Sequence, residues 1–423
     1  MSFLEKLHEV KVEWKALGDI GSFTRGKRFV KTDMTSEGVS CIHYGEMYTH
    51  YGVWAEESKS FLDERLAKKL RFANCGDVII VAAGETIEDI GNGTAWLSKN
   101  DVVIHDACFS YKSDLNPKYV SYFLRTNSFK EQIKKSISSG KISAINENGL
   151  SKALIPIPYP ENPKKSLKIQ SEIVRILDAF SAMTVELTTK LTYELSMRKK
   201  QYNYYRDQLL SLQVDEVHLR PLIELTLPTN NIRWKENEES FRYIDLTSVS
   251  RETNTIIKTT EITADNAPSR AQKIVEENDV IFATTRPTQL RKCLINKTYA
   301  GAIASTGYCI LRAKSSLVLP KWIYFYLSST DFFKYLEDNQ SGSAYPAISD
   351  SKVKEFKLPI PYPDDPEKSL AEQARIVSIL EKFDEVFISI TKSLPCEIER
   401  RQQQYDYYRD LLFSFPKSKM VEA

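Results

Sequence analysis

The segment Pro156-Ile157-Pro158-Tyr159-Pro160 recurs 203 positions later as Pro359-Ile360-Pro361-Tyr362-Pro363. With this offset kept and no gap, 15 of the 25 positions from 156 to 180 are identical to their counterparts from 359 to 383. The same offset pairs residues 201–207 with residues 404–410, which differ at one position. A period of about 200 residues is far longer than the period of solenoid repeats. We therefore predict that the chain is a tandem duplication.

Upstream of the matched segments the similarity fades but persists. Residues 76–79, Gly-Asp-Val-Ile, parallel 278–281, Asn-Asp-Val-Ile, and a Ser-Gly pair near the end of each module, at 139 and 341, precedes an Ala-Ile pair. Each half is thus a variable module followed by a matched region. We expect the limits 1–155 for the first module, 156–213 for its matched region, 214–358 for the second module and 359–423 for its matched region.

Each matched region reads as one long helix of about 45 residues, or about 70 Å. Pro163 and Pro366 are expected to lie just before it, Ser166 and Ser369 are the expected N-caps, and Pro395 is expected to kink or locally break the second copy. Apolar residues recur at spacings of three and four, as in a helix that pairs with another helix. The residues that we assign to helix pairing or subunit docking are Ile173, Leu177, Phe180, Leu187, Leu191, Tyr205, Ile376, Leu380, Phe383, Ile390, Tyr408 and Leu412.

Two helices of equal length with matching stripes are expected to pair side by side and antiparallel, related by a pseudo-twofold axis. The alternative is that each helix packs only on its own module. In the modules, Val78–Ala83, Asp101–Ile104 and Ala302–Ala304 read as strands. Residues 119–124 and 322–327 read as short helices, each followed by a second one, so the predicted class is α+β.

Composition is that of a soluble globular protein of two or three domains. The chain has 423 residues, of which 42% are hydrophobic and 27% charged, and its formal net charge is +2. No apolar run approaches the roughly 20 residues needed to cross a bilayer, and the start of the chain lacks the apolar core of a signal peptide. Six scattered cysteines suggest free thiols and a cytoplasmic location. A nucleic-acid binder usually carries a stronger basic excess.

Enzyme motifs are weak or absent. Residues 21–27 resemble a phosphate-binding loop, but Arg28 stands where Ser or Thr would hold magnesium. The Asn-Pro-Pro-aromatic signature of adenine methyltransferases is only approached at 116–119, where the proline favours a helix start. The five histidines show no metal-ligand spacing, and His105-Asp106 is better read as an ordinary surface or core pair. We therefore expect no catalytic residue and no metal site in this chain.

Basic, amide and aromatic side chains interleave in the loops of both modules. Arg, Lys, Asn and Gln are the side chains that bind phosphates and read base edges, although for any single one of them a solvated loop residue is the favoured reading. The candidates for DNA contact are Arg25, Lys27, Arg28, His43, Tyr44, Tyr48, Lys141, Asn231, Arg233, Lys235, Arg286, Gln289, Arg291 and Lys292. Gly26 is expected to let the backbone approach a partner.

The whole chain resembles the specificity subunit of type I restriction–modification enzymes. The resemblance lies in two dissimilar modules, each ending in Pro-Ile-Pro-x-Pro and followed by a Gln-x-x-Ile-Val-x-x-Leu helix, here at 170–177 and 373–380. The Glu-Gln that usually opens this helix motif is present at 372–373, whereas the first copy has Ile169-Gln170. The glycines at 140 and 342 fit the pattern at the end of each module.

The resemblance implies two α/β target-recognition domains, each reading one half of a split double-stranded DNA sequence, joined by an antiparallel coiled coil that fixes the gap. It also implies two modification subunits, which carry S-adenosylmethionine and the methylation chemistry, and restriction subunits with ATP and magnesium where these join. By this reading the chain is non-catalytic and binds no cofactor or membrane. The alternative is a protein–protein interaction scaffold with a helical dimerisation rod.

Overall fold

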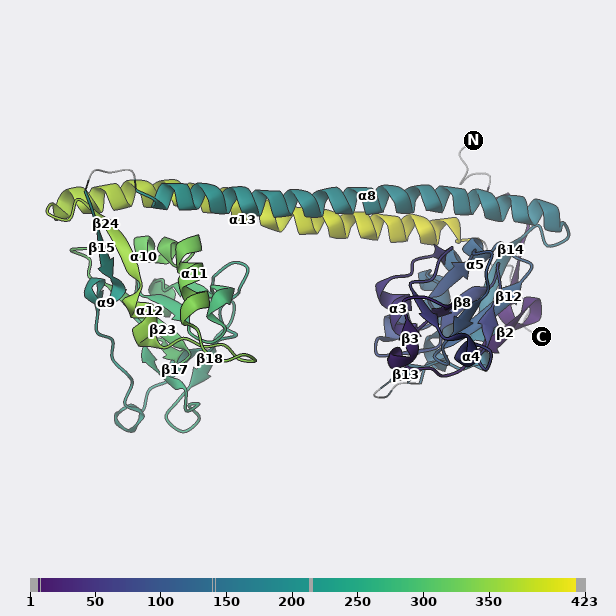
Figure 1. The fold of residues 1–423 in the computed structure, drawn as a ribbon, viewed down its shortest axis with the longest axis horizontal. Helices are drawn as coiled ribbons and strands as arrows, with labels where there is room; N and C mark the ends of the chain where they lie inside the picture. The colour runs from purple at the N-terminus through teal and green to yellow at the C-terminus, as the bar shows by residue number, and fades with distance from the viewer. Residues whose placement is uncertain (1–6, 8, 139, 141, 213–215, 416–423) are drawn as a thin grey trace. The chain divides into compact units, whose positions relative to one another are not determined.

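The computed structural model describes residues 7, 9–138, 140, 142–212 and 216–415. The chain forms two compact units, residues 1–189 with 397–423 (unit 1) and residues 190–396 (unit 2). Each unit holds one module, the first half of one long helix and the second half of the other. Figure 1 shows the elements of both units with their labels.

Module 1, the part of unit 1 that precedes its long helix, combines short strands with short helices. Its strands are β1 (Val12–Ala16), β2 (Gly21–Arg25), β3 (Met34–Thr35), β4 (Val39–Ile42), β5 (Trp54–Ala55), β6 (Ser60–Leu62), β7 (Phe72–Ala73), β8 (Val78–Val81), β9 (Ala83–Gly84), β10 (Gly93–Trp96), β11 (Val102–Ile104), β12 (Cys108–Ser113), β13 (Ser143–Ala144) and β14 (Leu154–Pro158). Its helices are α2 (Leu17–Ile20), α3 (Tyr44–Thr49), α4 (Glu64–Ala67), α5 (Pro117–Phe123), α6 (Asn127–Ile133) and α7 (Glu147–Ser151), with 3-10 turns η1 (Lys31–Asp33), η2 (Ile87–Asp89) and η3 (Lys134–Ser136).

Module 2, the corresponding part of unit 2, has fewer strands. They are β15 (Val217–Pro221), β16 (Thr226–Leu227), β17 (Phe241–Ile244), β18 (Thr260–Ile262), β19 (Ala271–Ile274), β20 (Val280–Ala283), β21 (Lys292–Leu294), β22 (Ile303–Ser305), β23 (Tyr308–Ala313) and β24 (Lys357–Pro361). Its helices are α9 (Leu222–Leu225), α10 (Pro320–Tyr326), α11 (Thr330–Asn339) and α12 (Asp350–Glu355), with 3-10 turns η4 (Trp234–Glu236), η5 (Pro287–Gln289) and η6 (Lys297–Tyr299).

The two modules repeat one sheet topology. In module 1 the strand orders are β2-β12-β8-β10-β5 and β3-β6-β4-β11-β7, and in module 2 they are β16-β23-β20-β21 and β18-β17-β22-β19. Both second sheets contain one parallel pair, β4 with β11 and β17 with β22. The predicted strands at 78–83, 101–104 and 302–304 are confirmed as β8, β11 and β22, and the predicted helices as α5, α6, α10 and α11.

The Pro-Ile-Pro-Tyr-Pro segments each form an edge strand and a turn. β14 pairs with β1 and β24 with β15, in two-stranded antiparallel sheets where a missing proline N–H is tolerated. Tyr159 and Tyr362 both adopt a left-handed backbone conformation at φ 48°. Lys165 and Lys368, in the first helical turn that follows, lie 3.6 and 3.8 Å from the centres of these two tyrosine rings. The turn between module and helix is therefore built identically twice.

The long helices are α8 (Pro163–Leu210) and α13 (Pro366–Leu412). Their lengths match the prediction, but the predicted caps are wrong. The side chains of Asn162 and Asp365 accept the N–H groups of Lys165 and Lys368, so the prolines occupy the first helical position instead of preceding the helix. The predicted local break at Pro395 is also wrong, because α13 continues through it, whereas the kink stays a prediction.

In each unit the two long helices pack antiparallel (Figure 1). In unit 1 the rings of Phe180 and Tyr408 stack with their centres 5.5 Å apart. In unit 2 the rings of Tyr205 and Phe383 stack at 6.2 Å. Later residues of α8 thus meet earlier residues of α13, as predicted for an antiparallel pair.

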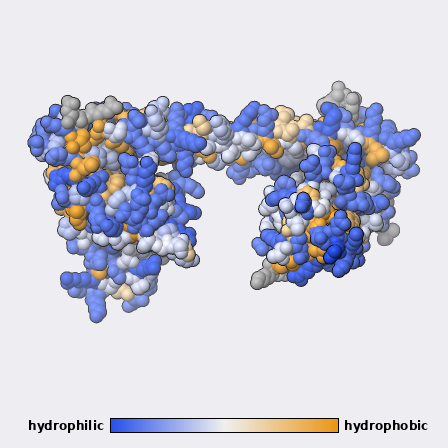
Figure 2. All heavy atoms as spheres, in the orientation of Figure 1, coloured by the Kyte–Doolittle hydropathy of each residue, from blue (hydrophilic) through white to orange (hydrophobic). Residues whose placement is uncertain are grey.

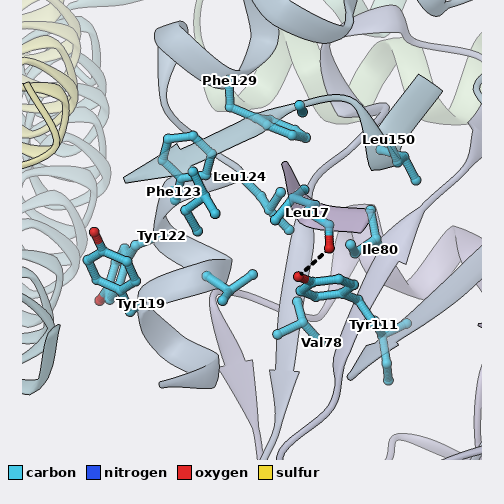
Figure 3. Close-up of a cluster of buried hydrophobic side chains, with 14 of the residues drawn as sticks. Leu17, Val78, Ile80, Tyr111, Tyr119, Tyr122, Phe123, Leu124, Phe129 and Leu150 are labelled. Carbon is cyan, nitrogen blue, oxygen red and sulfur yellow. Dashed lines mark hydrogen bonds between the residues drawn. The ribbon is translucent and has the colours of Figure 1, made fainter. Parts of the chain in front are cut away.

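The start of each long helix also belongs to the core of a module. Ile173, Val174 and Leu177 are buried in one cluster with module 1 and Leu412 of α13, and Ile376, Val377 and Leu380 are buried with module 2 and Leu210 of α8. Figure 3 shows part of the first cluster, where the Tyr111 hydroxyl donates to the Leu17 carbonyl oxygen at 3.0 Å. Both predicted modes of packing, on the other helix and on the module, occur.

The predicted architecture is confirmed: two modules of mixed strands and helices with two long helices packed together. On the face drawn in Figure 2 hydrophilic residues dominate, and hydrophobic residues form smaller groups. Among the described residues, no helix combines the length and the hydropathy needed to cross a membrane.

Candidate nucleic-acid interface

Each module is fixed to its helix by one buried glutamine of the Gln-x-x-Ile-Val motif. Gln170 and Gln373 are both fully buried. The side-chain oxygen of Gln170 accepts the Asn116 N–H at 2.8 Å, and that of Gln373 accepts the Leu319 N–H at 2.9 Å. Both amide nitrogens donate to a serine hydroxyl one turn earlier in the helix. The segment whose N–H donates this bond leads directly into α5 or α10. The glutamine therefore orients the module on the helix.

Module 1 gathers positive charge at the end of β2. Arg25, Lys27 and Arg28 are all exposed, and Arg25 donates through Nε to the Asp106 carbonyl oxygen at 2.9 Å. Lys27 donates to the carbonyl oxygen of Lys69 at 2.9 Å. Arg71, which sequence reasoning missed, donates to the Arg25 carbonyl oxygen at 2.7 Å. We call Arg25, Lys27, Arg28, Lys69 and Arg71 the basic patch of module 1.

Gly26 lies at the centre of this patch for a reason other than the predicted one. A Cβ at this position would come within 2.2 Å of the His105 carbonyl oxygen and 2.4 Å of the Ile104 carbonyl oxygen. The close approach that glycine permits is therefore to the chain's own backbone, not to a partner. Residues 21–27 do not form a phosphate-binding loop, because residues 21–25 form strand β2.

Two histidines lie beneath the basic patch in an aromatic cluster. The rings of His43 and His105 are centred 4.6 Å apart, and Tyr44 and Phe29 contact both. Burial lowers the pKa of both imidazoles; next in importance, for His43, is the positive charge of His105. His105 also accepts the Ala107 N–H at Nδ1, beside the Asp106 carboxylate. Sequence reasoning placed His105 and Asp106 in an ordinary pair, and the structure places His105 in this cluster.

The remaining candidates of module 1 do not extend the basic patch. Tyr48 is half-buried, and its hydroxyl donates to the Ala83 carbonyl oxygen at 2.9 Å. Lys141 lies outside the described residues. The loop after β9 is acidic, with Glu85, Glu88 and Asp89.

In module 2 the candidates fall in two loops. Asn231, Arg233 and Lys235 are exposed around η4, where Trp234 anchors the loop by donating to the Ala271 carbonyl oxygen. Arg286 and Gln289 are exposed in the loop after β20, and Arg291 is partly exposed. This second loop follows the same central strand as the acidic loop of module 1, so the two modules carry opposite charge at equivalent places.

Lys292 is buried, in contrast to its neighbours. Its side chain is 3% exposed, and its ammonium lies 4.8 Å from the ring centre of Tyr324 in α10. Burial, reinforced by the charge of Arg206, lowers the pKa of Lys292 to about 7, whereas Asp384 raises it. In this structure Lys292 is part of the contact between module 2 and the long helices and is not displayed on the surface.

The residues assigned to helix pairing occupy two environments. Ile173, Leu177, Ile376, Leu380 and Leu412 are in the module cores, as described above. Phe180, Tyr205, Phe383 and Tyr408 form the two ring stacks between the helices. Leu187, Leu191 and Ile390 are half-buried on the helices.

Metal and small-molecule sites are not prominent. Among the described residues, no three His, Cys, Asp or Glu side chains are grouped to hold a metal ion. A cavity of about 650 Å³ lies between module 1 and the helices within unit 1, lined in part by Arg125 and Lys130. The Lys130 ammonium is already bound to three oxygens, of Glu88, Ile90 and Asn92, and burial lowers its pKa to about 7. This cavity is therefore a poor match for an anionic cofactor.

The chain was compared with protein families and with known proteins. The family model for the type I restriction modification DNA specificity domain matches residues 9–197 and 225–400. The chain is 33% identical over 445 residues to the specificity subunit of the Escherichia coli type I restriction enzyme EcoR124I/EcoR124II, covering 100% of this chain and 99% of that one. It is 33% identical over 292 residues to the E. coli EcoprrI specificity subunit, covering 67% and 65% of the two chains.

Two solved structures are similar to parts or all of the chain. The HsdS subunit from Thermoanaerobacter tengcongensis is 30% identical, with a TM-score of 0.39 over 45% of this chain and 47% of that one. The type I S subunit from M. genitalium is 15% identical, with a TM-score of 0.38 over 97% of both chains.

Proposed function

Because the chain belongs to the family of type I restriction–modification specificity subunits, we propose that each of its modules reads one half of a bipartite DNA sequence. A specificity subunit is a non-catalytic part of the type I complex. In this proposal α8 and α13 set the spacing between the half-sites and bind two modification subunits. The module limits 1–155 and 214–358 are part of the proposal.

The observation that carries the proposal is a repeated frame with unlike loops. The frame residues recur in kind and geometry: Gln170 and Gln373 make equivalent bonds, and Tyr159 and Tyr362 make the same turn. The exposed loops do not recur, since the loop after the central strand is acidic in module 1 and basic in module 2. Two readers of different half-sites require equal frames with unequal loops. Contacts with bases determine which sequence is recognised, whereas the frame determines where the loops are placed.

The proposed contacts with DNA come from exposed residues. In module 1 the basic patch supplies Arg25, Lys27 and Arg28, and in module 2 the two loops supply Asn231, Arg233, Lys235, Arg286, Gln289 and Arg291. His43, Tyr44 and Tyr48 support the first set from below, and Lys141 and Lys292 have no assigned contact. Each phosphate contact by a lysine or arginine makes the affinity depend on salt.

The exposed apolar side chains of the long helices support the docking of partner subunits. On the helices Met183, Val185 and Tyr407 of unit 1 are 62–65% exposed, as are Tyr193, Tyr204 and Val386 of unit 2, at 60–65%. A contiguous patch of exposed apolar side chains marks a protein-binding site, and in this proposal these residues contribute to such patches. The partners would carry S-adenosylmethionine for methylation and, where restriction subunits join, ATP and magnesium. The cytoplasm, where chromosomal DNA is found in bacteria, is the proposed location.

Exchange of one module tests the assignment. Residues 14–155 would be replaced by the first module of another specificity subunit, and the hybrid expressed with the modification subunits. Methylome sequencing should show one new half-site, with the other half-site and the spacer unchanged. The matched control exchanges residues 219–358, which should change the other half-site. An unchanged recognition sequence in both hybrids contradicts the proposal.

A binding measurement distinguishes the proposed DNA reader from the rival function, a protein-binding scaffold. Gel shifts with duplex DNA would be run at two salt concentrations, with the chain alone and with a modification subunit. Sequence-specific binding that weakens with salt supports a DNA reader. Stable binding of the modification subunit without any DNA binding favours the scaffold.

A further inference from the structure

The loop after β20 in module 2, residues 284–291, is held in a strained shape. Arg286 and Leu290 both have a left-handed backbone, with φ 50° at each, which side chains other than glycine rarely adopt. Pro287, between them, is buried and begins the short turn η5. Such strain persists only where the surrounding structure enforces it, and it concentrates at functional sites.

A second loop, residues 341–347, enforces this shape. Thr285 bridges Ala347, and the Arg286 N–H donates to the Pro346 carbonyl oxygen at 2.7 Å. Each loop is also closed at its own base: Ala283 N–H donates to Arg291, and Ser341 and Ala347 exchange two backbone hydrogen bonds at 2.8 Å. The two loops are therefore pinned to each other and to the sheet.

The pinned loops bring together two exposed side chains that are 59 positions apart in the sequence. The guanidinium carbon of Arg286 lies 5.3 Å from the ring centre of Tyr345, and Tyr345 is 73% exposed. Among the described residues, Arg286 has no ion pair and no side-chain hydrogen bond. A tyrosine ring beside a guanidinium restrains its position through a cation–π contact, and the N–H groups of Arg286 keep their capacity to donate to a ligand.

A guanidinium with free N–H groups can bind two kinds of ligand on duplex DNA. Arginine binds the O6 and N7 atoms of guanine through two parallel hydrogen bonds in the major groove, and this is the commonest specific contact between proteins and DNA. It also binds phosphate through two hydrogen bonds, but that contact carries no sequence information, whereas Arg286 lies in a loop that differs between the two proposed readers. On this basis we propose that Arg286, oriented by Tyr345, reads a guanine in the half-site of module 2. The inference rests on the proposed function of the module.

The described residues of module 1 do not form the same arrangement. The corresponding backbone bond exists, because Ile145 N–H donates to Ala82 as Ile348 N–H donates to Thr284. However, the loop that follows β9 offers Glu85, Glu88 and Asp89, and Tyr48 lies against Gly84, where a Cβ would meet its hydroxyl at 2.2 Å. The guanine contact is thus specific to module 2.

The test uses the full chain in complex with its modification subunits. Methylome sequencing of the wild-type complex first defines both half-sites, and absence of any bipartite site would refute the proposed function itself. Duplexes with each base pair of the module 2 half-site changed in turn are then compared between wild type, Arg286→Lys and Arg286→Ala. Arg286→Ala should lose about 5- to 100-fold discrimination at one guanine and keep the other positions, whereas Arg286→Lys should keep part of it, because lysine can also donate to O6 and N7 of guanine.

Modified bases and matched variants sharpen the result. Replacing that guanine by 7-deazaguanine, which lacks the N7 acceptor, should weaken binding by the wild type and have no further effect on Arg286→Ala. Tyr345→Phe should retain the discrimination and Tyr345→Leu should lose part of it. Arg251→Ala, an exposed arginine in another loop of module 2, should leave discrimination as it is. Recognition of the module 1 half-site and an unchanged melting temperature establish that each variant is folded.

Two outcomes would overturn the inference. If Arg286→Ala keeps the full preference for guanine at every position, Arg286 does not read a guanine. If Arg286→Ala weakens binding to all duplexes equally, its contact is with a phosphate. In both cases a bipartite methylation pattern of the wild type leaves the proposed function of the modules standing.

Discussion

The hydroxyl of Tyr202 on α8 donates a hydrogen bond to the carboxylate of Asp384 on α13 in unit 2. The repeat places the same pair of positions in unit 1, where Ser181 and Tyr405 share a hydrogen bond of 2.9 Å. The partner of the tyrosine is thus a buried carboxylate in one unit and a neutral hydroxyl in the other. Burial raises the pKa of Asp384, and the bond from Tyr202 opposes that rise.

Removal of either tyrosine hydroxyl should therefore have unequal effects. Tyr202→Phe leaves a buried carboxylate without its donor, and we expect unit 2 to lose about 1.5–3 kcal/mol of stability. Tyr405→Phe is the matched control and should cost unit 1 about 0.5–1.5 kcal/mol. Chemical denaturation of the full chain, monitored with one probe in each unit, measures the loss of stability in both variants. Equal losses in the two variants would show that the charge of Asp384 is immaterial.

The buried glutamines give a second test, of how a module is held on its helix. Gln373→Leu would leave the Leu319 N–H and the Leu317 carbonyl oxygen without their partner, at a cost of about 1–3 kcal/mol for each buried group. The Leu319 amide should then exchange its hydrogen far faster than in the wild type. Gln170→Leu is the counterpart and should expose the Asn116 amide instead. Wild-type protection of Leu319 in Gln373→Leu would rule out this role for the glutamine.

Lys292 provides a test that depends on pH. Its pKa is about 7 in the folded chain and about 10.4 when unfolded, so the unfolded chain holds one more proton between these values, and stability rises with pH there. Lys292→Met removes the penalty of burying a cation near Arg206, Asp384 and Tyr324, and should be more stable by about 1–4 kcal/mol below pH 7. The difference between the melting temperatures of the two proteins should narrow from pH 7 to pH 10.

A constant difference across this pH range would contradict the role of Lys292 as a buried titrating group. The DNA affinity of the Lys292→Met complex is the accompanying measurement. Because the side chain is 3% exposed, the affinity should equal that of the wild type. A large loss of DNA affinity at unchanged stability would show that Lys292 does contact DNA, as the sequence predicted.

The repeat made the frame of the fold predictable from the sequence. Identical residues such as Gln170 and Gln373 mark positions with identical contacts, and the apolar stripe of α8 and α13 correctly indicated an antiparallel pair. The N-caps were missed because Asn162 and Asp365 differ between the copies. A comparison of the two copies that counts only identical residues misses this pair, although asparagine and aspartate are both good N-cap residues.

The candidate site was less predictable, because its contacts join residues far apart in the chain. Nothing local relates Arg286 to Tyr345, and only the pairing of the two loops brings them together. Lys292 reads as the last residue of a basic loop, yet it is the first residue of β21, and its side chain faces α10. Residue type was enough to identify the basic loops. The structure was needed to show that Lys292 is buried while its basic neighbours are exposed or partly exposed.

The register of the helix pair defines how the spacing between half-sites can be altered. Phe180 meets Tyr408 in unit 1 and Tyr205 meets Phe383 in unit 2, so the same register holds in both units. Continued along the helices within unit 2, it matches residues 192–198 of α8 with residues 390–396 of α13. Deleting both segments removes two turns from each helix and preserves the apolar stripe, since seven residues are close to two full turns.

We expect this double deletion to shorten the recognised spacer and to leave both half-sites unchanged. Seven residues at 1.5 Å each are about 10 Å, or about three base pairs at 3.4 Å. Methylome sequencing of cells that express the shortened chain with the modification subunits measures the spacer directly. Deleting residues 192–198 alone is the control: it shifts Tyr202 past Asp384 and should abolish methylation. Altered half-sites with an unchanged spacer would mean that the helices do not set the distance.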